Sequence, residues 1–255
     1  MTAADITIGP VRLIRSDCRA VLADLDPVDQ VICDPPYEQS LHDAKNSGRA
    51  LRADGGAELR GLDFDGIDAY RTDFVAQVVP LCRGWLIAFC TAEGVGRWAD
   101  AINPAKGIRY KRACAWHKPD GAPQFNGQGP AAWGEMFVAA WCGTGYARWN
   151  GGGKRGFYSE LVNPRDRHGG HPTEKPWRLM RNILFDFTGP GDLVLDPFAG
   201  SGATLVAAVL TGRRAIGIEI NPDYFDMAVA RVRKAVAQAG ALGIQPAPQI
   251  QEALL

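Results

Sequence analysis

Short apolar runs rich in Val, Ile and Leu alternate along the chain with longer segments whose apolar residues recur at helical spacing. The short runs are typical of buried strands and the longer segments of amphipathic helices. The predicted strands are Val11–Ile14, Val28–Cys33, Trp85–Cys90, Arg109–Trp116, Met136–Trp141, Leu193–Leu195 and Ala215–Ile220. The predicted helices are Ala69–Cys82, Gly94–Asn103, Pro176–Thr188, Gly202–Gly212 and Pro222–Gln238. This alternation predicts an α/β fold in which helices cover both faces of a mainly parallel sheet.

Two Gly-rich, polar stretches, Glu38–Asp68 and Gly143–Gly170, interrupt the alternation. Loops this long inside a compact domain are usually functional, so we expect both to take part in binding. No Ser- or Pro-rich linker divides the chain, which predicts a single domain over residues 1–255. Residues 239–255 have the composition of a loose tail.

The charges balance, with 28 basic and 28 acidic residues, so no net field draws the protein to nucleic acid. Basic residues do gather between Arg148 and Arg181, which allows a local nucleic-acid-binding patch. The six Cys never form C-x-x-C pairs, which indicates reduced thiols in a cytoplasmic protein and no metal site. The longest apolar run is too short for a membrane helix, and Met1–Pro10 lacks the basic region of a signal peptide.

The strand predicted over Val28–Cys33 runs directly into Asp34-Pro35-Pro36-Tyr37. A rigid turn is the simplest reading of such residues. Two successive prolines, however, fix φ and remove backbone donors, which leaves carbonyls to face a ligand. A carboxylate beside them accepts hydrogen bonds from an exocyclic amino group, and the aromatic ring can stack on a planar base. Because open α/β sheets bind ligands at the C-terminal ends of their strands, we predict a catalytic site here.

A second motif, D-P-F-A-G-S-G, occupies positions 196–202 between a predicted strand and a predicted helix. Glycines let the backbone approach a ligand closely, and the helix N-terminus offers free N–H groups. About twenty residues later the next strand reaches Glu219, where an acidic residue can bind the two hydroxyls of a ribose. The motif is neither G-x-G-x-x-G nor a P-loop, so a nucleoside without a pyrophosphate fits better than NAD or a nucleotide.

D-P-P-Y followed by D-P-F-A-G-S-G resembles the S-adenosylmethionine-dependent DNA amino-methyltransferases in the β arrangement, where the catalytic motif precedes the cofactor motif. The segments H-P-T-E-K-P (171–176) and R-S-D-C (15–18) match two further family signatures, although the family more often has Gly at position 16. The resemblance covers most of the chain. It implies a Rossmann-like methyltransferase fold with a seven-stranded sheet and a circularly permuted motif order.

The resemblance also implies roles for matching positions. Residues 1–142 would form the catalytic half, 143–170 a short target-recognition region and 171–238 the cofactor-binding half. The predicted catalytic residues are Asp34, Pro35, Pro36 and Tyr37. The predicted cofactor-binding residues are Asp17 and Cys18 at the adenine, Glu219 and Ile220 at the ribose, Thr173 and Lys175 at the methionine carboxylate, and Asp196, Phe198, Ala199, Gly200, Ser201 and Gly202 in the pocket wall.

The target base would leave the duplex, donate its amino hydrogens to Asp34 and the Pro35 carbonyl, and stack on Tyr37. Asp at the first motif position favours N6 of adenine, and N4 of cytosine is the alternative. The predicted contacts with double-stranded DNA are Arg148, Lys154, Arg155, Arg165 and Arg167. Because the recognition region is short, we expect a short site, relaxed specificity, or recognition shared with Glu38–Asp68 or with the second subunit of a homodimer.

Two other functions remain open at this stage. Pockets of the D/N-P-P-Y type also serve methyltransferases that act on RNA or on a protein glutamine, but there the cofactor motif usually comes first. A non-catalytic nucleic-acid-binding protein could share the fold, although such proteins usually lose the catalytic tetrapeptide or the glycine turn. Both motifs are intact in this chain.

Overall fold

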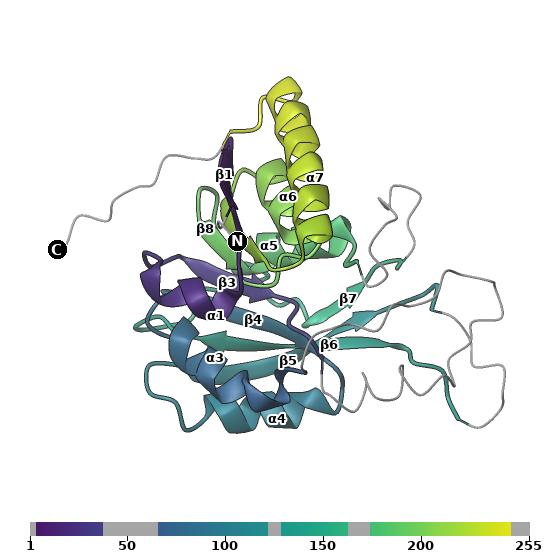
Figure 1. Cartoon of the computed structure of the whole chain (residues 1–255). Coiled ribbons are helices and arrows are strands. Elements are labelled where there is room, and N and C mark those ends of the chain that lie inside the picture. Colours follow the sequence, from purple (N-terminus) through teal and green to yellow (C-terminus); the bar gives the residue numbers. More distant parts are fainter. Residues whose placement is uncertain (1–3, 38–65, 122–128, 163–173, 246–255) are drawn as a thin grey trace.

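A nine-stranded sheet runs through the part of the chain that the computed structural model describes, residues 4–37, 66–121, 129–162 and 174–245. Figure 1 shows how the strands fan across the molecule. The strands are β1 (Ala4–Ile8), β2 (Val11–Arg15), β3 (Gln30–Cys33), β4 (Trp85–Cys90), β5 (Arg109–His117), β6 (Gly134–Trp141), β7 (Phe157–Ser159), β8 (Leu193–Asp196) and β9 (Arg214–Glu219). Their order in the sheet is β1-β2-β9-β8-β3-β4-β6-β5-β7.

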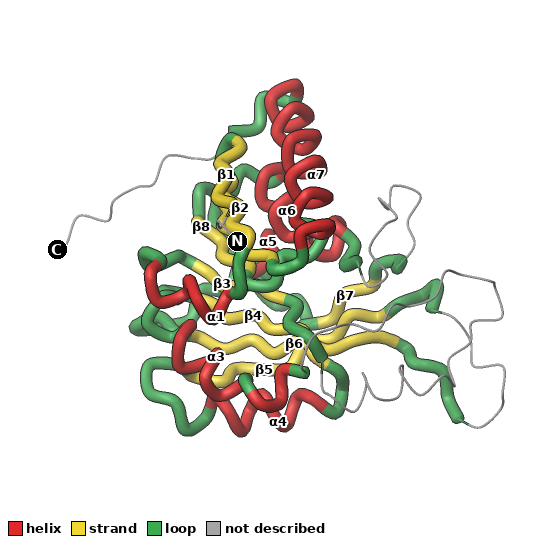
Figure 2. The backbone as a smooth tube through the Cα atoms, viewed as in Figure 1, coloured by secondary structure: helices red, strands yellow, loops and turns green. Residues whose placement is uncertain are grey.

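Helices cover both faces of this sheet (Figure 2). The helices are α1 (Cys18–Val21), α3 (Arg71–Val78), α4 (Gly94–Ile102), α5 (Trp177–Phe187), α6 (Ala203–Leu210) and α7 (Pro222–Ala241), with short 3-10 turns at Leu22–Asp24 and Ile67–Ala69. Residues of α5, α6 and α7 share one buried apolar cluster with one face of the sheet. Residues of α1, α3 and α4 share a second cluster with the opposite face. The molecule therefore has three layers.

Five neighbouring strands, β2, β9, β8, β3 and β4, run parallel to one another. The chain leaves β8 through α6 toward β9 on one side, and it leaves β3 toward β4 on the other. Between β8 and β3 the connections therefore diverge, which opens a crevice at the C-terminal ends of the two strands. Beyond β4, β6 is antiparallel to both β4 and β5.

The α/β fold class is confirmed, but the expected count of seven strands is wrong. The two added strands lie at the edges of the sheet. β1 alternates half-buried and exposed residues and joins β2 through a tight turn at Gly9, whose positive φ of 55° suits glycine. β7 has three residues and pairs with β5. Neither strand carries the continuous apolar run by which buried strands are recognised.

Two predicted helix boundaries also need correction. The helix expected to reach Cys82 ends at Val78, because Pro80 lacks the N–H that a further turn would need. The tail expected from Ala239 begins later, since α7 continues to Ala241 and Ala239 is buried in the core. Residues 246–255 lie outside the described residues. No described helix has both the length and the apolar character needed to cross a membrane.

Candidate active site

Four acidic residues mark the C-terminal ends of four neighbouring parallel strands. Asp17 follows β2, Glu219 ends β9, Asp196 ends β8 and Asp34 follows β3. Because the strands are parallel, all four carboxylates lie at the C-terminal ends of the strands, on the same side of the sheet's end, where they line a single cavity of about 990 Å³. That volume is at the upper end of the range for small-molecule sites. The fold thus brings the two sequence motifs into one cavity.

The glycine turn between β8 and α6 forms the floor of the cofactor side of this cavity. Gly202 caps α6 with a positive φ of 84°, and an added Cβ would lie 3.1 Å from Ala228. The Glu219 carboxylate holds the turn in place, because it accepts the Gly200 N–H at 2.7 Å and the Asn221 N–H at 2.8 Å. Ile220, half exposed beside it, offers an apolar surface at the cavity wall. Gly200, Glu219 and Ile220 line the cavity, whereas Gly202 is buried at the start of α6 and does not line it. Their contacts with a cofactor stay a prediction.

Asp196 lies deeper, with 3% of its surface exposed. Its Oδ1 accepts the backbone N–H of Phe198 at 3.0 Å, and burial raises the pKa of its carboxyl to about 7. Phe198 and Ala199 line the cavity wall next to it. Ser201 also lines the cavity, and its Oγ accepts a hydrogen bond at 2.6 Å from Arg231 of α7.

Asp17 and Cys18 lie at the start of α1, on the far side of the cavity. The Asp17 carboxylate caps the helix through the Arg19 N–H at 2.9 Å and also binds the Arg19 guanidinium at 2.5 Å. These hydrogen bonds to Arg19 lower the pKa of Asp17, so it is ionised at neutral pH. Burial raises the pKa of the Cys18 thiol to about 12, which leaves it uncharged. The adenine contacts expected of this pair stay a prediction.

Asp34, Pro35, Pro36 and Tyr37 line the other side of the cavity, and Lys175 reaches across to them. The Lys175 ammonium lies 2.6 Å from Asp34 Oδ2 and donates to the Tyr37 hydroxyl at 3.1 Å. We expected Lys175 to hold the methionine carboxylate of the cofactor, and that contact stays a prediction. In the structure its ammonium group binds Asp34 and Tyr37. The reason is tertiary: Lys175 stands just before α5, beside the end of β3, with 7% of its side chain exposed.

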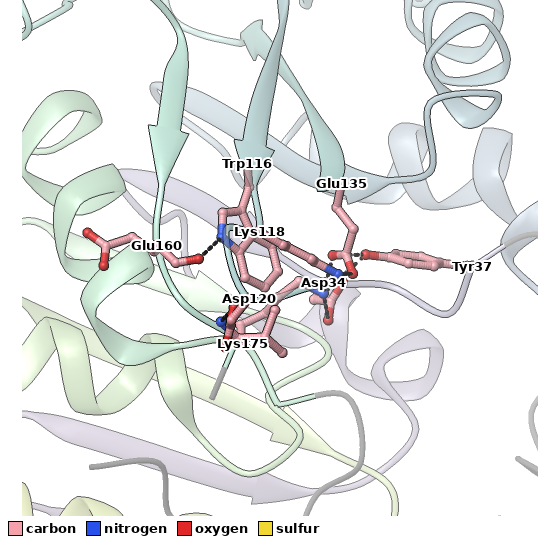
Figure 3. Close-up of polar contacts among 9 residues, drawn as sticks. Asp34, Tyr37, Trp116, Lys118, Asp120, Glu135, Glu160 and Lys175 are labelled. Atoms are coloured by element: carbon pink, nitrogen blue, oxygen red, sulfur yellow. Dashed lines mark hydrogen bonds and ion pairs between the residues drawn. The ribbon is translucent and has the colours of Figure 1, made fainter. Parts of the chain in front are cut away.

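Glu135 and Lys118 join this group, and the sequence had not singled out either of them (Figure 3). Glu135 Oε2 accepts from the Tyr37 hydroxyl at 2.5 Å and lies 3.0 Å from the Lys175 ammonium, while Oε1 pairs with Lys118. Burial would raise the pKa of Glu135, but the two lysines outweigh it and lower that pKa to about 2. The sequence signal that could have pointed to Glu135 is a lone carboxylate at the start of an apolar strand, G-E-M-F-V-A-A-W.

One oxygen of Asp34 remains open. Oδ1 is buried and has no hydrogen-bond partner, although Oδ2 is held by Lys175. A buried acceptor without a partner is costly, so such an atom in a cavity marks a place where a ligand donates. Burial raises the pKa of Asp34, Glu135 adds to the rise and Lys175 opposes it. An N–H donor such as an amino group would supply the hydrogen bond that Oδ1 lacks.

The residues predicted to contact DNA lie in different parts of the protein. Trp85, the first residue of β4, donates its indole N–H to the carbonyl of Arg148, so Arg148 lies at the sheet edge opposite the cavity. The two ends of β4 lie about 17 Å apart, and this length separates the Arg148 carbonyl from the end of the strand at the cavity. Lys154 is paired with Asp186 of α5 at 2.5 Å, which ties the Gly-rich segment to the body of the protein. Direct contact with a duplex at the cavity is not supported for these two. Arg155 is exposed, and its role stays a prediction. Arg165, Arg167 and Thr173 lie outside the described residues.

A buried ion pair connects the glycine turn to α7. Arg231 donates to the Ser201 carbonyl at 2.8 Å and pairs with Glu174 at 2.8 Å, and both side chains are at most 6% exposed. Glu174 is one of the residues that line the cavity, and its Oε2 is buried without a partner. Among the described residues, no cluster of His, Cys, Asp and Glu could hold a metal ion.

The sequence profile of the DNA methylase family, which covers N6- and N4-methyltransferases, matches residues 28–230. This chain belongs to that family. Its methyl donor is S-adenosylmethionine, as the resemblance implied, and its substrate is DNA. Adenine-N6 and cytosine-N4 enzymes share the family, so membership leaves the base open.

Named relatives agree with this assignment. The methylase is 30% identical over 244 residues to the Escherichia coli K12 protein YubD, a match that covers 90% of this chain and 95% of that one. It is 48% identical over 67 residues to the E. coli K12 DNA adenine methyltransferase YhdJ, which is 26% of this chain and only 23% of YhdJ. The crystal structure of the M1.HpyAVI–SAM complex shares the fold, with a TM-score of 0.67 and 24% identity over 87% of this chain and 98% of that one.

The residues of this methylase fit the cofactor. Gly200 lines the cavity without a side chain that would obstruct a ligand, and the carboxylates of Glu219 and Glu174, which also line it, suit hydroxyl and ammonium donors. The cofactor carries positive charge on its sulfonium and ammonium groups. The acidic residues along this edge of the sheet therefore match it in sign.

Cofactor affinity should depend on pH through Asp196. Its pKa is about 7 in the free protein, and a bound cation favours its charged form, so binding weakens as protons re-enter below that value. The Kd for S-adenosylmethionine should rise about tenfold from pH 8 to pH 6. Calorimetric titrations of the wild type and Asp196→Asn will measure this; the variant should bind more weakly with a flat profile. Asp226→Asn, exposed on α7, is the control, and a flat wild-type profile would disprove the role.

Proposed function

We propose that this DNA methylase transfers a methyl group from S-adenosylmethionine to the exocyclic N6 of adenine in double-stranded DNA, after the base has left the helix. The observation that carries this proposal is the open Oδ1 of Asp34, a buried acceptor in the same cavity as the glycine turn. An amino group in that cavity completes the hydrogen bonding of Asp34. It also comes to lie on the side of the cavity that faces the cofactor motif.

The protein's own residues activate the amino nitrogen. The N6 lone pair of adenine is delocalised into the ring, which makes the nitrogen a poor nucleophile. Hydrogen bonds from the amino group to Asp34 Oδ1 and the Pro35 carbonyl favour a tetrahedral nitrogen and return density to the lone pair. When bound, S-adenosylmethionine supplies a methyl group that its sulfonium already activates, so positioning provides much of the remaining rate.

Tyr37 holds the base. Extrusion from the duplex costs a few kcal/mol, and stacking on an aromatic ring returns about 1–3 kcal/mol of that. The ring is fixed in place because its hydroxyl donates to Glu135 and accepts from Lys175. Burial raises the pKa of Tyr37, so the hydroxyl keeps its proton at neutral pH.

Two observations support adenine over cytosine. The first motif residue is Asp34, as is more usual in adenine enzymes of the family, and YhdJ is a DNA adenine methyltransferase. N4 of cytosine presents the same kind of amino group and is the alternative. Long-read sequencing of DNA from a methylation-deficient host that expresses this protein tests the proposal. Modified adenine in a defined context supports it, modified cytosine supports the alternative, and unmodified DNA would redirect the search to RNA or protein substrates.

DNA affinity should depend on Arg165 and Arg167, the last two arginines of the recognition region. If each contacts a phosphate, replacing both by alanine removes about two units from the slope of log K against log salt. Titration of a duplex by fluorescence anisotropy at several salt concentrations measures the slope. Arg148→Ala is the matched control, because the structure places Arg148 at the opposite sheet edge. An unchanged slope in the double variant, or an equal loss in the control, would contradict the prediction.

A further inference from the structure

The polar atoms around Asp34 are almost completely paired with one another (Figure 3). Lys175 has three N–H donors, and Asp34 Oδ2, Glu135 Oε2 and the Tyr37 hydroxyl lie 2.6, 3.0 and 3.1 Å away. Glu135 Oε1 accepts from Lys118, and Tyr37 donates to Glu135 Oε2. The two lysines and two carboxylates balance in charge. Asp34 Oδ1 is the acceptor that stays open in this group.

Glu135 contacts three of the polar side chains in this cluster. It receives hydrogen bonds or ion pairs from Lys175, Tyr37 and Lys118, which come from three different parts of the chain. Its backbone is fixed because it is the second residue of β6, in register with Trp116 of β5. The Lys175 ammonium lies 5.1 Å from the centre of the Phe89 ring and 5.2 Å from that of Tyr37, so aromatic faces fill the rest of its surroundings.

We propose that Glu135 is a positioning residue for methyl transfer: by sharing Lys175 with Asp34 and fixing Tyr37, it leaves one oxygen of Asp34 free to accept the amino group of the target base. The inference rests on the proposed role of Asp34 at that amino group. It assigns no contact with the base to Glu135 itself.

The physical reason is electrostatic. Attack by the amino nitrogen builds positive charge next to Asp34, and a carboxylate stabilises that charge only as far as its own charge is not already compensated. Glu135 divides the field of Lys175 between two carboxylates. Without the charge of Glu135, Lys175 has Asp34 as its one remaining carboxylate partner in this cluster, and the Tyr37 hydroxyl has at most a neutral, weaker acceptor at position 135. Both changes weaken the activation and the orientation of the base.

Glu135→Gln tests the inference, because it removes the charge and keeps the shape. With duplex DNA from a methylation-deficient host and radiolabelled S-adenosylmethionine, kcat should fall about 10- to 100-fold. The Kd for S-adenosylmethionine should stay within about twofold, since Glu135 belongs to the base side of the cavity. Glu160→Gln is the matched control; it is also a carboxylate near this edge, bonded to Asn182, and should keep wild-type kcat. Glu135→Asp should recover part of the loss, because it restores the charge.

Two readouts separate positioning from a merely structural role. The groups that face Asp34 are Lys175, Lys118, Glu135, Tyr37 and Asp196, and Glu135 is one of those whose charge raises the pKa of Asp34. The acid limb of the kcat–pH profile should therefore shift to lower pH in Glu135→Gln. In a Lys175→Met background, Glu135→Gln should lower kcat by a clearly smaller factor than in the wild type, since the shared lysine is gone and only the contact with Tyr37 is weakened.

Wild-type kcat with an unmoved acid limb in Glu135→Gln would overturn the inference. So would a loss of kcat that is accompanied by an equal loss of cofactor affinity and of thermal stability. If the wild-type protein itself transfers no methyl group to DNA, the proposed function is wrong, and the inference about Glu135 is then wrong as well. These outcomes are distinguishable because the wild type is assayed beside the variants.

Discussion

Asp34→Ala should lower methyl transfer to DNA by at least about 10²–10³-fold, while S-adenosylmethionine still binds within about threefold of the wild-type Kd. The variant removes the open acceptor Oδ1, so an amino group in the cavity no longer has the carboxylate that activates its lone pair. Lys175 keeps Glu135 and Tyr37 as partners, which preserves the fold around the site. Transfer of labelled methyl to DNA, with cofactor binding by calorimetry, measures both effects.

Two further variants sharpen that result. Asp34→Asn keeps an amide oxygen as an acceptor but loses the charge, so its rate should lie between those of the wild type and Asp34→Ala. Asp5→Ala removes an exposed aspartate that pairs with Arg12 at the edge of the sheet, and it should leave transfer unchanged. Turnover by Asp34→Ala at the wild-type rate would refute the catalytic assignment.

Arg231→Met should destabilise the protein by about 3–5 kcal/mol, because it leaves the buried Glu174 carboxylate without its cation. The same change releases the Ser201 carbonyl and hydroxyl, which Arg231 holds at 2.8 and 2.6 Å. The glycine turn then loses its support from α7, so cofactor affinity should fall as well. Urea denaturation gives the free energy of unfolding, and titration of the folded variant gives the Kd.

The matched control lies two residues away on the same helix. Arg233 is exposed, and Arg233→Met should change the free energy of unfolding by less than about 0.5 kcal/mol. Adding Glu174→Gln to Arg231→Met removes the uncompensated charge and should restore much of the lost stability. Equal stabilities of Arg231→Met and Arg233→Met would show that the buried pair does not stabilise the fold.

The local parts of the site could be predicted because each is continuous in sequence. D-P-P-Y directly follows a strand of four buried residues, and D-P-F-A-G-S-G lies between β8 and a helix that is buried almost throughout. Patterns of this kind depend on side-chain period and on glycine conformation, which act over a few residues. The same locality explains the failures at β1 and β7, whose short edge strands are fixed by pairing with a neighbour rather than by their own composition.

The partners of Asp34 could not be predicted in this way. Glu135 lies 98 residues from Tyr37, and Lys175 lies 141 residues from Asp34. Lys118 follows β5, and only the antiparallel register of β5 and β6 brings it to Glu135. In the same way, nothing in the sequence around Arg148 indicates which end of the sheet it occupies.

The sequence by itself determined the family, the glycine turn after β8 and the place of D-P-P-Y at the end of β3, because these are runs of residues whose backbone and chemistry are set by immediate neighbours. The tertiary structure decided which groups share the site. The order of the strands places the ends of β8 and β3 side by side, and pairing with β6 brings Glu135 to Asp34. Charges interact through space and not along the chain, so the state of Asp34 depends on residues that only the folded sheet brings within 3 Å of Lys175.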